Sequence, residues 1–443
     1  MNRSVRLRVA AVALLTALAV AACGGDDDSS DAPTTDAPTT DAPTTDAPTT
    51  DAPTTDAPTT DAPTTDAPTT DAPTTDAPNS DGATGSGPAD DSKSTIRIGW
   101  ANLETGTPSF PDATDGALAG VEYITSELNG INGHPVELVV CGVDATPETN
   151  QACGQQFAND DDMAIVTLGL DVNGGALYSA LGGKPFVGAV PLTPADFDVE
   201  NGVFYYGGLP AVQIGAADFV QTLDVSTIAY FYEDSATGLD GANLFTGALE
   251  GSGIDVTTVP IGASADVLPP VTQSGATDAD LVINGVADCL PIAEALDALG
   301  TSGDIMTFSS CVNAQNLAER PELFEGWYVV SFAKLLTVAD GVDEETDLFR
   351  STYPEFSPKG ATTPGLFSEK GWGLLLSVHD ALDAVADETL ESPDALVEAL
   401  AAFTGPVNMG TSTIECPGPA DYPSVCALSA VSYQIQNGLP QPL

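Results

Sequence analysis

The sequence predicts an α/β fold built from parallel sheets, in two similar lobes that follow a linker without a core. Its first folded stretch, Ile96–Val140, reads as a strand, a polar loop, an amphipathic helix and a second strand. A second series of alternating strands and helices begins near Ser226, and long helical stretches and late strands follow it. Because a strand–helix–strand unit joins parallel strands, two such series predict two parallel sheets.

In the opening unit, the branched residues of Ile96–Trp100 alternate with Arg97, which is typical of a strand. The helix is indicated by apolar residues that recur at helical spacing, namely Ala117, Val121, Ile124 and Leu128. The loop between them, Ala101–Asp115, follows the carboxyl end of the first strand, where open α/β sheets bind ligands. This loop is therefore the first place to expect a binding site.

The remaining elements continue the same alternation. Further strands are expected at Glu137–Val140, Ala164–Leu168, Pro185–Val190, Val203–Tyr206, residues 228–233, residues 254–261, Leu281–Ile283, Met306–Phe308, Trp327–Phe332 and Ala430–Ile435. Helices are expected at Gln155–Asp160, Gly174–Leu181, Ala211–Leu223, Gly238–Leu249, Ile292–Leu299, Lys370–Ala386 and Asp394–Phe403.

The N-terminus has the features of an export signal. Arg3, Arg6 and Arg8 precede an apolar run, Val9–Ala22, which is short for a transmembrane helix. The run ends in small residues followed by Cys23, a pattern that resembles the bacterial lipoprotein signal. We expect residues 1–22 to be removed and Cys23 to carry lipid, which would anchor the chain to the cell membrane. An ordinary secretory signal with an incidental cysteine is the alternative.

Residues 23–94 are expected to form a disordered tether. From Asp31 to Thr75 the chain repeats DAPTT nine times, and a tenth unit reads DAPNS. No apolar side chain larger than proline occurs in these repeats, so they can form no core. Regular proline favours extended segments, and the aspartates repel one another. The tract is a spacer, and its threonines are plausible sites of O-glycosylation.

The charge excludes nucleic acid as a partner. The chain has 11 Lys and Arg residues against 64 Asp and Glu, a formal net charge of −53. Such a surface repels phosphate backbones, and no basic patch offsets that repulsion. Acidity favours solubility, and the sequence does not separate a saline habitat from lineage bias.

Six cysteines remain once Cys23 is assigned to lipid. An even number in an exported chain implies disulfides, with fifteen possible pairings. Proximity in sequence favours Cys141–Cys153, Cys289–Cys311 and Cys416–Cys426. A metal site is the alternative, but no C-x-x-C occurs and the two histidines, His134 and His379, lie far from the cysteines in sequence. We therefore expect neither a metal nor a cofactor.

Catalytic motifs are absent from the sequence. It contains no G-x-S-x-G, no Walker-type glycine loop and no G-x-G-x-x-G. His379-Asp380 resembles a catalytic dyad, but it lies in the apolar helical stretch GWGLLLSVHDALDAV, where a histidine is more often structural. The protein is not expected to be an enzyme.

The order of several segments resembles the type I periplasmic solute-binding proteins, in the branched-chain amino acid and amide branch of ABC-transporter receptors. The matching segments are IRIGWANLETG, GALAGVEYITSELNGINGHPVELVVCGVDATPE, AIVTLGLDVNGGAL, FVGAVPLTP, IAYFYEDSATGLDGANLF and DADLVINGVADC. The resemblance covers Thr95–Leu443 and implies two Rossmann-like lobes that clamp a ligand. It places residues 95–206 and 340–404 in the N-terminal lobe and residues 207–339 and 405–443 in the C-terminal lobe. The three hinge crossovers would fall near Tyr206–Leu209, Phe332–Lys334 and Gly405–Val407.

The resemblance also implies a set of ligand-binding positions. In the first lobe these are Glu104, Thr105, Phe110, Asp171, Asn173, Leu192 and Thr193, and in the second they are Asp234, Asn284, Asp288 and Ser309. Thr193 matches a family hydroxyl, whereas Asn173 stands where a serine is usual. Ser309 stands where amino-acid binders carry an acid, and Thr237 replaces the tyrosine of a Tyr-Gly motif. A buried ammonium without a counter-charge is costly, so an amide, a polyol, an aromatic acid or a short peptide fits as well as an amino acid.

The expected function is that of a monomeric, lipid-anchored extracytoplasmic receptor that delivers a small polar ligand to an ABC importer. The lobes would close on the ligand, because only the closed state contacts it from both sides. One alternative is a sensor component that signals ligand occupancy to a membrane receptor. A hydrolase on a similar fold is a weaker alternative. The sequence leaves the identity of the ligand open.

Overall fold

The computed structural model describes residues 87–262, 266–358, 360–383 and 385–443. The predicted signal, Cys23 and the DAPTT repeats lie outside these residues. Within the described ranges, no helix combines the length and the apolar character needed to cross a bilayer.

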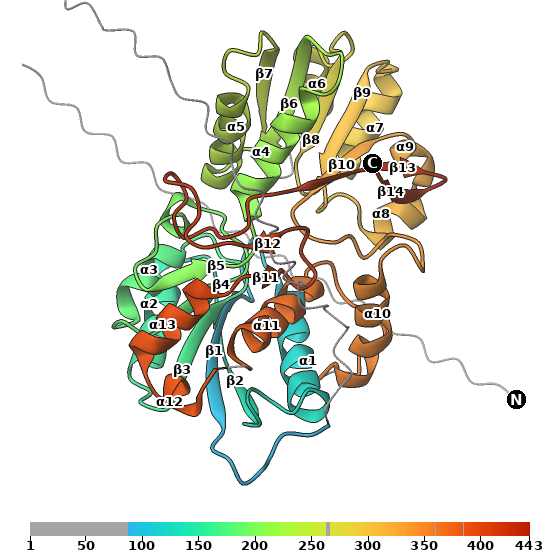
Figure 1. The fold of residues 1–443 in the computed structure, drawn as a ribbon. Helices are drawn as coiled ribbons and strands as arrows, with labels where there is room; N and C mark the ends of the chain where they lie inside the picture. The colour runs from blue at the N-terminus through green and yellow to red at the C-terminus, as the bar shows by residue number, and fades with distance from the viewer. Residues whose placement is uncertain (1–86, 263–265, 359, 384) are drawn as a thin grey trace, which may run out of the picture. The chain divides into compact units, whose positions relative to one another are not determined.

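Two sheets with helices on both faces form the fold (Figure 1). The first sheet has five parallel strands in the order β2-β1-β3-β4-β5. Its strands are β1 (Ile96–Leu103), β2 (Val136–Val143), β3 (Met163–Leu168), β4 (Phe186–Gly188) and β5 (Gly202–Phe204). The helices that connect them are α1 (Pro111–Glu127), α2 (Pro147–Ala158) and α3 (Gly174–Ala180), with a 3-10 turn at Pro194–Asp196. This sheet and its helices are called the N-terminal lobe below.

The second sheet has seven strands in the order β14-β13-β10-β9-β8-β6-β7. They are β6 (Thr227–Glu233), β7 (Asp255–Ile261), β8 (Leu281–Gly285), β9 (Asp304–Phe308), β10 (Tyr328–Ser331), β13 (Val431–Gln436) and β14 (Leu439–Pro442). The first five are parallel, and β13 and β14 add an antiparallel edge. The helices of this C-terminal lobe are α4 (Gly208–Val220), α5 (Ala236–Ala248), α6 (Leu268–Gln273), α7 (Leu290–Leu299), α8 (Ala314–Glu319) and α9 (Pro321–Phe324).

After β10 the chain returns to the N-terminal lobe. There it forms α10 (Glu344–Phe356), α11 (Ser368–Leu382), α12 (Asp387–Leu390) and α13 (Pro393–Ala402), followed by a small antiparallel pair, β11 (Gly405–Pro406) and β12 (Thr413–Ile414). The α11 helix packs along α1, and Tyr123 of α1 stacks on Trp372 of α11 at 5.0 Å between ring centres. This contact belongs to a large apolar cluster that covers one face of the first sheet.

The sequence patterns missed α10, although Asp343 caps it by accepting a hydrogen bond from the amide of Thr346. Its second half contains Pro354, a residue that normally argues against a helix interior. The apolar face of α10 is also narrow, because only Thr346, Phe349 and Tyr353 of this helix are buried. The helix is therefore stabilised mainly by packing against α1, which the local sequence does not reveal.

Two further differences concern the ends of the folded part. The tether was expected to extend to residue 94, whereas residues 87–94 already pack on the N-terminal lobe. The amides of Gly87 and Ala89 donate to the carbonyl oxygens of Glu127 and Thr125 at 3.0 and 2.8 Å. Lys93 Nζ donates to the carbonyl oxygen of Asn132 at 2.7 Å. The last residues of the predicted tether therefore belong to the folded domain.

At the other end, the chain was expected to enter the C-terminal lobe at Gly405–Val407. Instead, residues 415–426, called the strap below, run along the outer strand of the first sheet. The amide of Phe204 donates to Ser424 O at 2.7 Å, and the amide of Cys426 donates to Phe204 O at 2.9 Å. The chain reaches the second sheet only at β13. These hydrogen bonds satisfy an otherwise unpaired sheet edge, which is why the strap stays with the first lobe.

The three disulfides predicted from sequence proximity are present in the structure. Cys141–Cys153 joins β2 to α2, Cys289–Cys311 joins the start of α7 to the loop after β9, and Cys416–Cys426 closes the strap. Each links residues within one lobe. They therefore stiffen the lobes without restricting movement between them.

Candidate ligand-binding site

The topology of both sheets places a binding site at their facing edges. In the first sheet β1 lies between β2 and β3, and in the second β6 lies between β7 and β8, so the chain direction across each sheet reverses at β1 and at β6. Ligands of open α/β sheets bind at such points, outside the carboxyl ends of the strands. A cavity of about 220 Å³ lies there, lined by residues of both lobes.

This cavity, called the aromatic compartment, is lined by residues near the carboxyl ends of the strands, in the loops after them, and in α4 and α5. Its N-terminal-lobe wall contains Phe110, Leu170, Val190 and Leu192, from the loops after β1, β3 and β4. Its C-terminal-lobe wall contains Tyr230, Tyr232, Glu233, Gly285, Ala287, Phe308, Ser309 and Ser310, with α4 and α5 supplying Leu209, Val212, Gln213, Thr237, Gly238 and Gly241. Phe332, Phe367 and Lys370 complete it.

Six aromatic side chains give this compartment its character, namely Phe110, Tyr230, Tyr232, Phe308, Phe332 and Phe367. Phe110 and Phe367 meet edge to face, with ring centres 4.8 Å apart. On the opposite lobe, Tyr230 is held in place by a hydrogen bond of 3.1 Å from its hydroxyl to Gln213 Oε1. Aromatic walls of this kind favour a planar apolar group.

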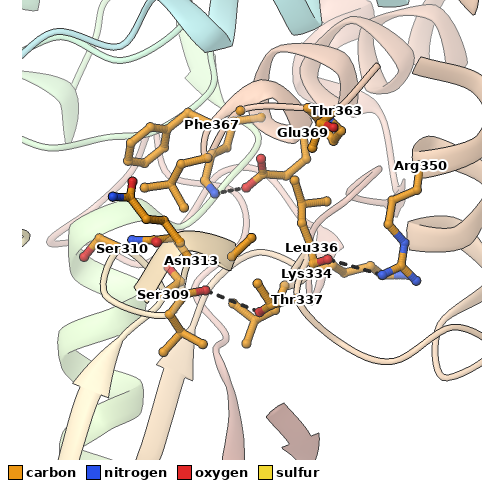
Figure 2. Close-up of a pocket in the computed structure, with 18 residues that line it drawn as sticks. Ser309, Ser310, Asn313, Lys334, Leu336, Thr337, Arg350, Thr363, Phe367 and Glu369 are labelled. Carbon is orange, nitrogen blue, oxygen red and sulfur yellow. Dashed lines mark hydrogen bonds and ion pairs between the residues drawn. The ribbon is translucent and has the colours of Figure 1, made fainter. Parts of the chain in front are cut away.

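A second cavity of about 420 Å³, called the polar compartment, adjoins the first (Figure 2). The two share Ser309, Ser310, Phe367 and Lys370. The polar compartment is also lined by the polar residues Asn313, Gln315, Lys334, Thr337, Arg350, Thr363 and Glu369, and by Val312, Ala314, Leu335, Leu336, Pro364, Gly365 and Leu366. The two compartments are therefore adjacent, and together they are called the cleft below.

Glu369 and Lys370 form a buried ion pair where the two compartments meet. The residues are 2% and 3% exposed, and Lys370 Nζ contacts Glu369 Oε1. The same ammonium lies 5.2 Å from the ring centre of Phe367 and 5.7 Å from that of Phe332. Glu369 Oε2 has no hydrogen-bond partner in the structure. Burial raises the pKa of Glu369, while the ammonium of Lys370 opposes that shift.

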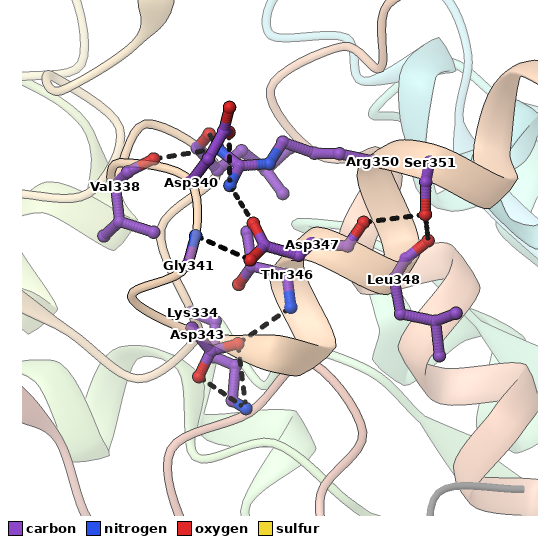
Figure 3. A network of polar contacts seen from close by, with 11 residues as sticks. Lys334, Val338, Asp340, Gly341, Asp343, Thr346, Asp347, Leu348, Arg350 and Ser351 are labelled. Atoms are coloured by element: carbon purple, nitrogen blue, oxygen red, sulfur yellow. Dashed lines mark hydrogen bonds and ion pairs between the residues drawn. The ribbon is translucent and has the colours of Figure 1, made fainter.

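The other two cations of the cleft are already neutralised (Figure 3). Lys334 Nζ lies 2.9 Å from Asp343 Oδ2 and 2.7 Å from Glu345 Oε2. Arg350 pairs with Asp347 and donates to the carbonyl oxygen of Val338 at 2.8 Å. Both side chains therefore hold the start of α10 against the second hinge connection, and neither has its charge free for a ligand.

Three of the eleven predicted ligand-binding residues line the cleft. Phe110 and Leu192 lie in the aromatic compartment, and Ser309 lies where the two compartments meet. All three lie in loops that follow a strand of a parallel sheet. Thr237, expected in place of a family tyrosine, also lines the aromatic compartment.

The two polar residues predicted in the first loop, Glu104 and Thr105, do not line the cleft. Glu104 accepts hydrogen bonds from Asn102 Nδ2 at 2.8 Å and from the hydroxyl of Thr114, which in turn accepts one from the indole of Trp100. Its carboxylate thus ties β1 to α1. Thr105 is exposed and lines neither compartment.

Asp171, Asn173 and Thr193 lie behind the N-terminal-lobe wall. The hydroxyl of Thr193 donates to Asp196 Oδ2 at 3.1 Å, and Asn173 Nδ2 donates to the carbonyl oxygen of Ala145 at 2.6 Å. Asp171 is 1% exposed, and its Oδ2 has no hydrogen-bond partner in the structure. Burial raises the pKa of Asp171 to about 6. These side chains shape the loops rather than line the cleft.

In the C-terminal lobe, Asp234 and Asp288 are exposed and do not line the cleft. Asn284 is buried within β8, where its Nδ2 donates to the carbonyl oxygen of Cys289 at 3.1 Å. The cleft acid of this lobe is instead Glu233, an exposed residue at the end of β6 whose Oε1 accepts from the amide of Ala287 at 3.1 Å.

Sequence reasoning missed the charged pair and most of the aromatic wall. Lys370 is one of only 11 basic residues, and it falls at the start of a predicted helix, which was a usable signal. Nothing local indicates that α11 begins beside the cleft, because that depends on its packing against α1. Among the described residues, no group of three or more His, Cys, Asp or Glu side chains is arranged to hold a metal ion.

These features agree with the comparison to known families. The sequence model of the periplasmic binding protein family matches residues 95–418, and the chain belongs to this family. Its members are extracytoplasmic, non-enzymatic proteins that bind small molecules and work with ABC-transporter permeases. The chain is therefore a solute-binding protein and not an enzyme.

Solved structures share the fold at low identity. An ABC transporter substrate-binding protein from Sphaerobacter thermophilus matches with a TM-score of 0.65 and 18% identity, over 77% of this chain and 94% of that one. A substrate-binding protein from Desulfitobacterium hafniense in complex with Leu has a TM-score of 0.59 and 17% identity, over 79% and 100%. A solute-binding protein from Rhodopseudomonas palustris HaA2 in complex with p-hydroxybenzoic acid has a TM-score of 0.63 and 16% identity, over 79% and 96%. No curated protein matches the chain.

Proposed function

We propose that the protein is a receptor that captures a small polar solute outside the cytoplasm and delivers it to an ABC importer. The observation that carries this proposal is the position of the aromatic compartment, which has walls from both lobes at the reversal points of both sheets. A ligand held there contacts both lobes at once. Ligand binding would therefore favour lobe closure, which an importer can recognise.

The hinge supports closure as the mechanism. Ala333 of the second connection pairs with Gly410, and the amide of Lys334 donates to Met409 O at 2.9 Å. These short backbone contacts bring the second connection beside the segment that follows β11. Few residues link the lobes, so their rotation requires few backbone changes.

The direct test is a melting-shift screen of the purified folded domain against amino acids, amides, sugars and aromatic acids. Binding to the native state alone raises the melting temperature, by an amount that grows with ligand concentration. We expect one chemical class to stabilise the protein well above the others. If no solute shifts the melting temperature at millimolar concentration, the receptor function is refuted.

We propose that the captured ligand is delivered to an importer and does not serve to signal to a receptor. Radiolabelled ligand should accumulate in proteoliposomes that contain the cognate permease only when the binding protein is added. Ligand-dependent association with a kinase or chemoreceptor, without uptake, would favour the sensor alternative.

The N-terminal sequence supports attachment by a lipid on Cys23. Replacing Cys23 with alanine should release the protein from the membrane fraction, while a Ser29→Ala control in the same segment should leave it bound. Membrane retention of the Cys23→Ala protein would contradict lipid anchoring.

A further inference from the structure

Basic side chains are concentrated in the cleft although they are rare in the chain as a whole. Acidic residues outnumber basic ones 64 to 11, yet Lys334, Arg350 and Lys370 all line the cleft. Two of these cations are neutralised by carboxylates of α10 and the loop before it. Lys370 pairs with the neighbouring Glu369, and it is the one basic side chain that lines the aromatic compartment.

The two residues of the Glu369–Lys370 ion pair differ in which compartment they line. Lys370 lines both of them, whereas Glu369 lines only the polar one. An ammonium has three N–H donors, and Glu369 Oε1 takes one of them. The ammonium lies near the rings of Phe332 and Phe367, which are themselves walls of the aromatic compartment. A group in that compartment therefore meets a buried positive charge with donors to spare.

The acid in this compartment does not balance that charge. Glu233 is exposed to solvent, and its Oε1 already accepts the amide of Ala287. Solvent weakens the field of an exposed carboxylate far more than that of a buried ammonium. A ligand ammonium placed in the aromatic compartment would thus meet repulsion from Lys370, because the buried counter-charge, Glu369, lines only the polar compartment.

We propose that the cleft selects an aromatic monocarboxylate, with the ring among the six aromatic side chains and the carboxylate bound to Lys370 Nζ. This inference rests on the proposed receptor function and names the class of its ligand. The aromatic compartment, at about 220 Å³, is below the ~300–1,000 Å³ typical of drug-sized sites, which suits a ligand with one ring. Ser309 and Ser310, at the boundary of the two compartments, supply further hydrogen-bond donors beside that carboxylate.

The first test compares three probes of similar shape by calorimetry on the folded domain. Benzoate should bind about 10-fold or more tightly than benzamide, because benzamide lacks the charge that Lys370 pairs with. Benzoate should also bind more tightly than phenylalanine, whose ammonium faces Lys370. Benzamide or phenylalanine binding as tightly as benzoate overturns the proposal.

The second test uses the ion pair itself. Glu369→Gln removes the carboxylate that competes for Lys370, so benzoate should bind several-fold more tightly than to the wild type. If the pair is purely structural, benzoate should bind no more tightly to the variant. If Glu369 instead holds a ligand ammonium, phenylalanine should bind less tightly to the variant than to the wild type. Either result contradicts the proposal.

The third test removes the cation without leaving a buried carboxylate unpaired. The double variant Glu369→Gln/Lys370→Met replaces both charges with side chains of similar size, which a buried pair commonly tolerates. Benzoate affinity should fall by about 30- to 100-fold while benzamide affinity is retained. Lys184→Met is the control, since Lys184 Nζ donates to the carbonyl oxygens of Asp160 and Met163 and lines neither compartment.

These results separate the two proposals. If amino acids, amides or sugars raise the melting temperature and benzoate does not, the receptor function stands and the aromatic carboxylate is excluded. If no solute raises it, the receptor function itself is refuted.

Discussion

The hydroxyl of Tyr206 donates a hydrogen bond of 2.5 Å to the carbonyl oxygen of Asn408. Tyr206 begins the first connection between the lobes, and Asn408 lies in the segment after β11. The Tyr206 ring also meets Phe332 of the second connection edge to face, with ring centres 6.2 Å apart. One buried tyrosine therefore joins the first connection to the second connection and to the segment after β11.

Replacing Tyr206 with phenylalanine should change ligand affinity as well as stability. The variant loses one buried hydrogen bond, so its free energy of unfolding should fall by about 1–2 kcal/mol. Because the bond lies at the hinge, the balance between open and closed states should shift too, which changes the apparent Kd. Urea unfolding and calorimetry with the best ligand measure the two effects.

Tyr205→Phe is the matched control for this prediction. Its hydroxyl donates to the carbonyl oxygen of Leu400 at 2.8 Å, which is a contact within the N-terminal lobe. It should lose a similar amount of stability and keep the wild-type Kd. Equal changes of Kd in both variants would contradict a hinge role for Tyr206.

Asp171 should make stability depend on pH. Its pKa is about 6 in the folded protein against 3.8 for the unperturbed group, so the folded state holds the proton more tightly. Stability should therefore fall as the pH rises from about 4 to about 6, by about 3 kcal/mol at most. In the Asp171→Asn variant, stability should no longer fall over this pH range. At pH 7.5 the variant should be more stable than the wild type by about 1–2 kcal/mol. Urea midpoints across the pH range provide the measurement.

Asp196→Asn should have the opposite effect at neutral pH. Burial raises the pKa of Asp196 as it does that of Asp171, but the Asp196 carboxylate accepts hydrogen bonds from Tyr178, Leu192 and Thr193, which oppose this shift. Loss of these bonds should destabilise the protein by about 2 kcal/mol. If both substitutions change stability in the same direction, the lack of a hydrogen-bond partner at Asp171 Oδ2 does not explain the effect of Asp171→Asn.

The disulfides should differ in what they stabilise. Cys289 and Cys311 are separated by 22 residues, so replacing both with alanine should cost about 3 kcal/mol of unfolding free energy. Cys416 and Cys426 are separated by 10 residues, so the corresponding double variant should lose somewhat less. Its effect should be concentrated in the strap, where amide hydrogen exchange should accelerate. Faster exchange throughout both lobes would contradict this local role.

The ion pairs of Lys334 should stabilise the start of α10. Lys334→Met leaves Asp343 and Glu345 facing each other without their cation, which should cost about 1–2 kcal/mol. Arg320 also binds two carboxylates, those of Glu294 and Glu322, but on the exposed surface. Arg320→Met should therefore cost less than about 0.5 kcal/mol, and equal losses would show that burial does not strengthen the Lys334 pairs.

Much of the fold could be predicted from the sequence because the patterns that indicate it are local. The strand–helix alternation from Ile96 onward depends on apolar periodicity and on turn residues, which act over a few positions. Proximity in sequence was enough to predict the disulfide pairing because each disulfide closes a short loop inside one lobe. Phe110, Leu192 and Ser309 line the cleft because residues that follow parallel strands face the ligand edge of such a sheet.

The structure alone decided the rest, because it depends on contacts between distant segments. Glu104 and Thr193 occupy loops at the ligand edge, yet neighbouring polar groups bind their side chains, and no spacing rule reveals that competition. The strap follows β5 because an open strand edge accepts its backbone groups. Lys370 enters the cleft because α11 packs on α1, so this lysine, more than 260 residues after the opening strand, meets the loop that this strand begins.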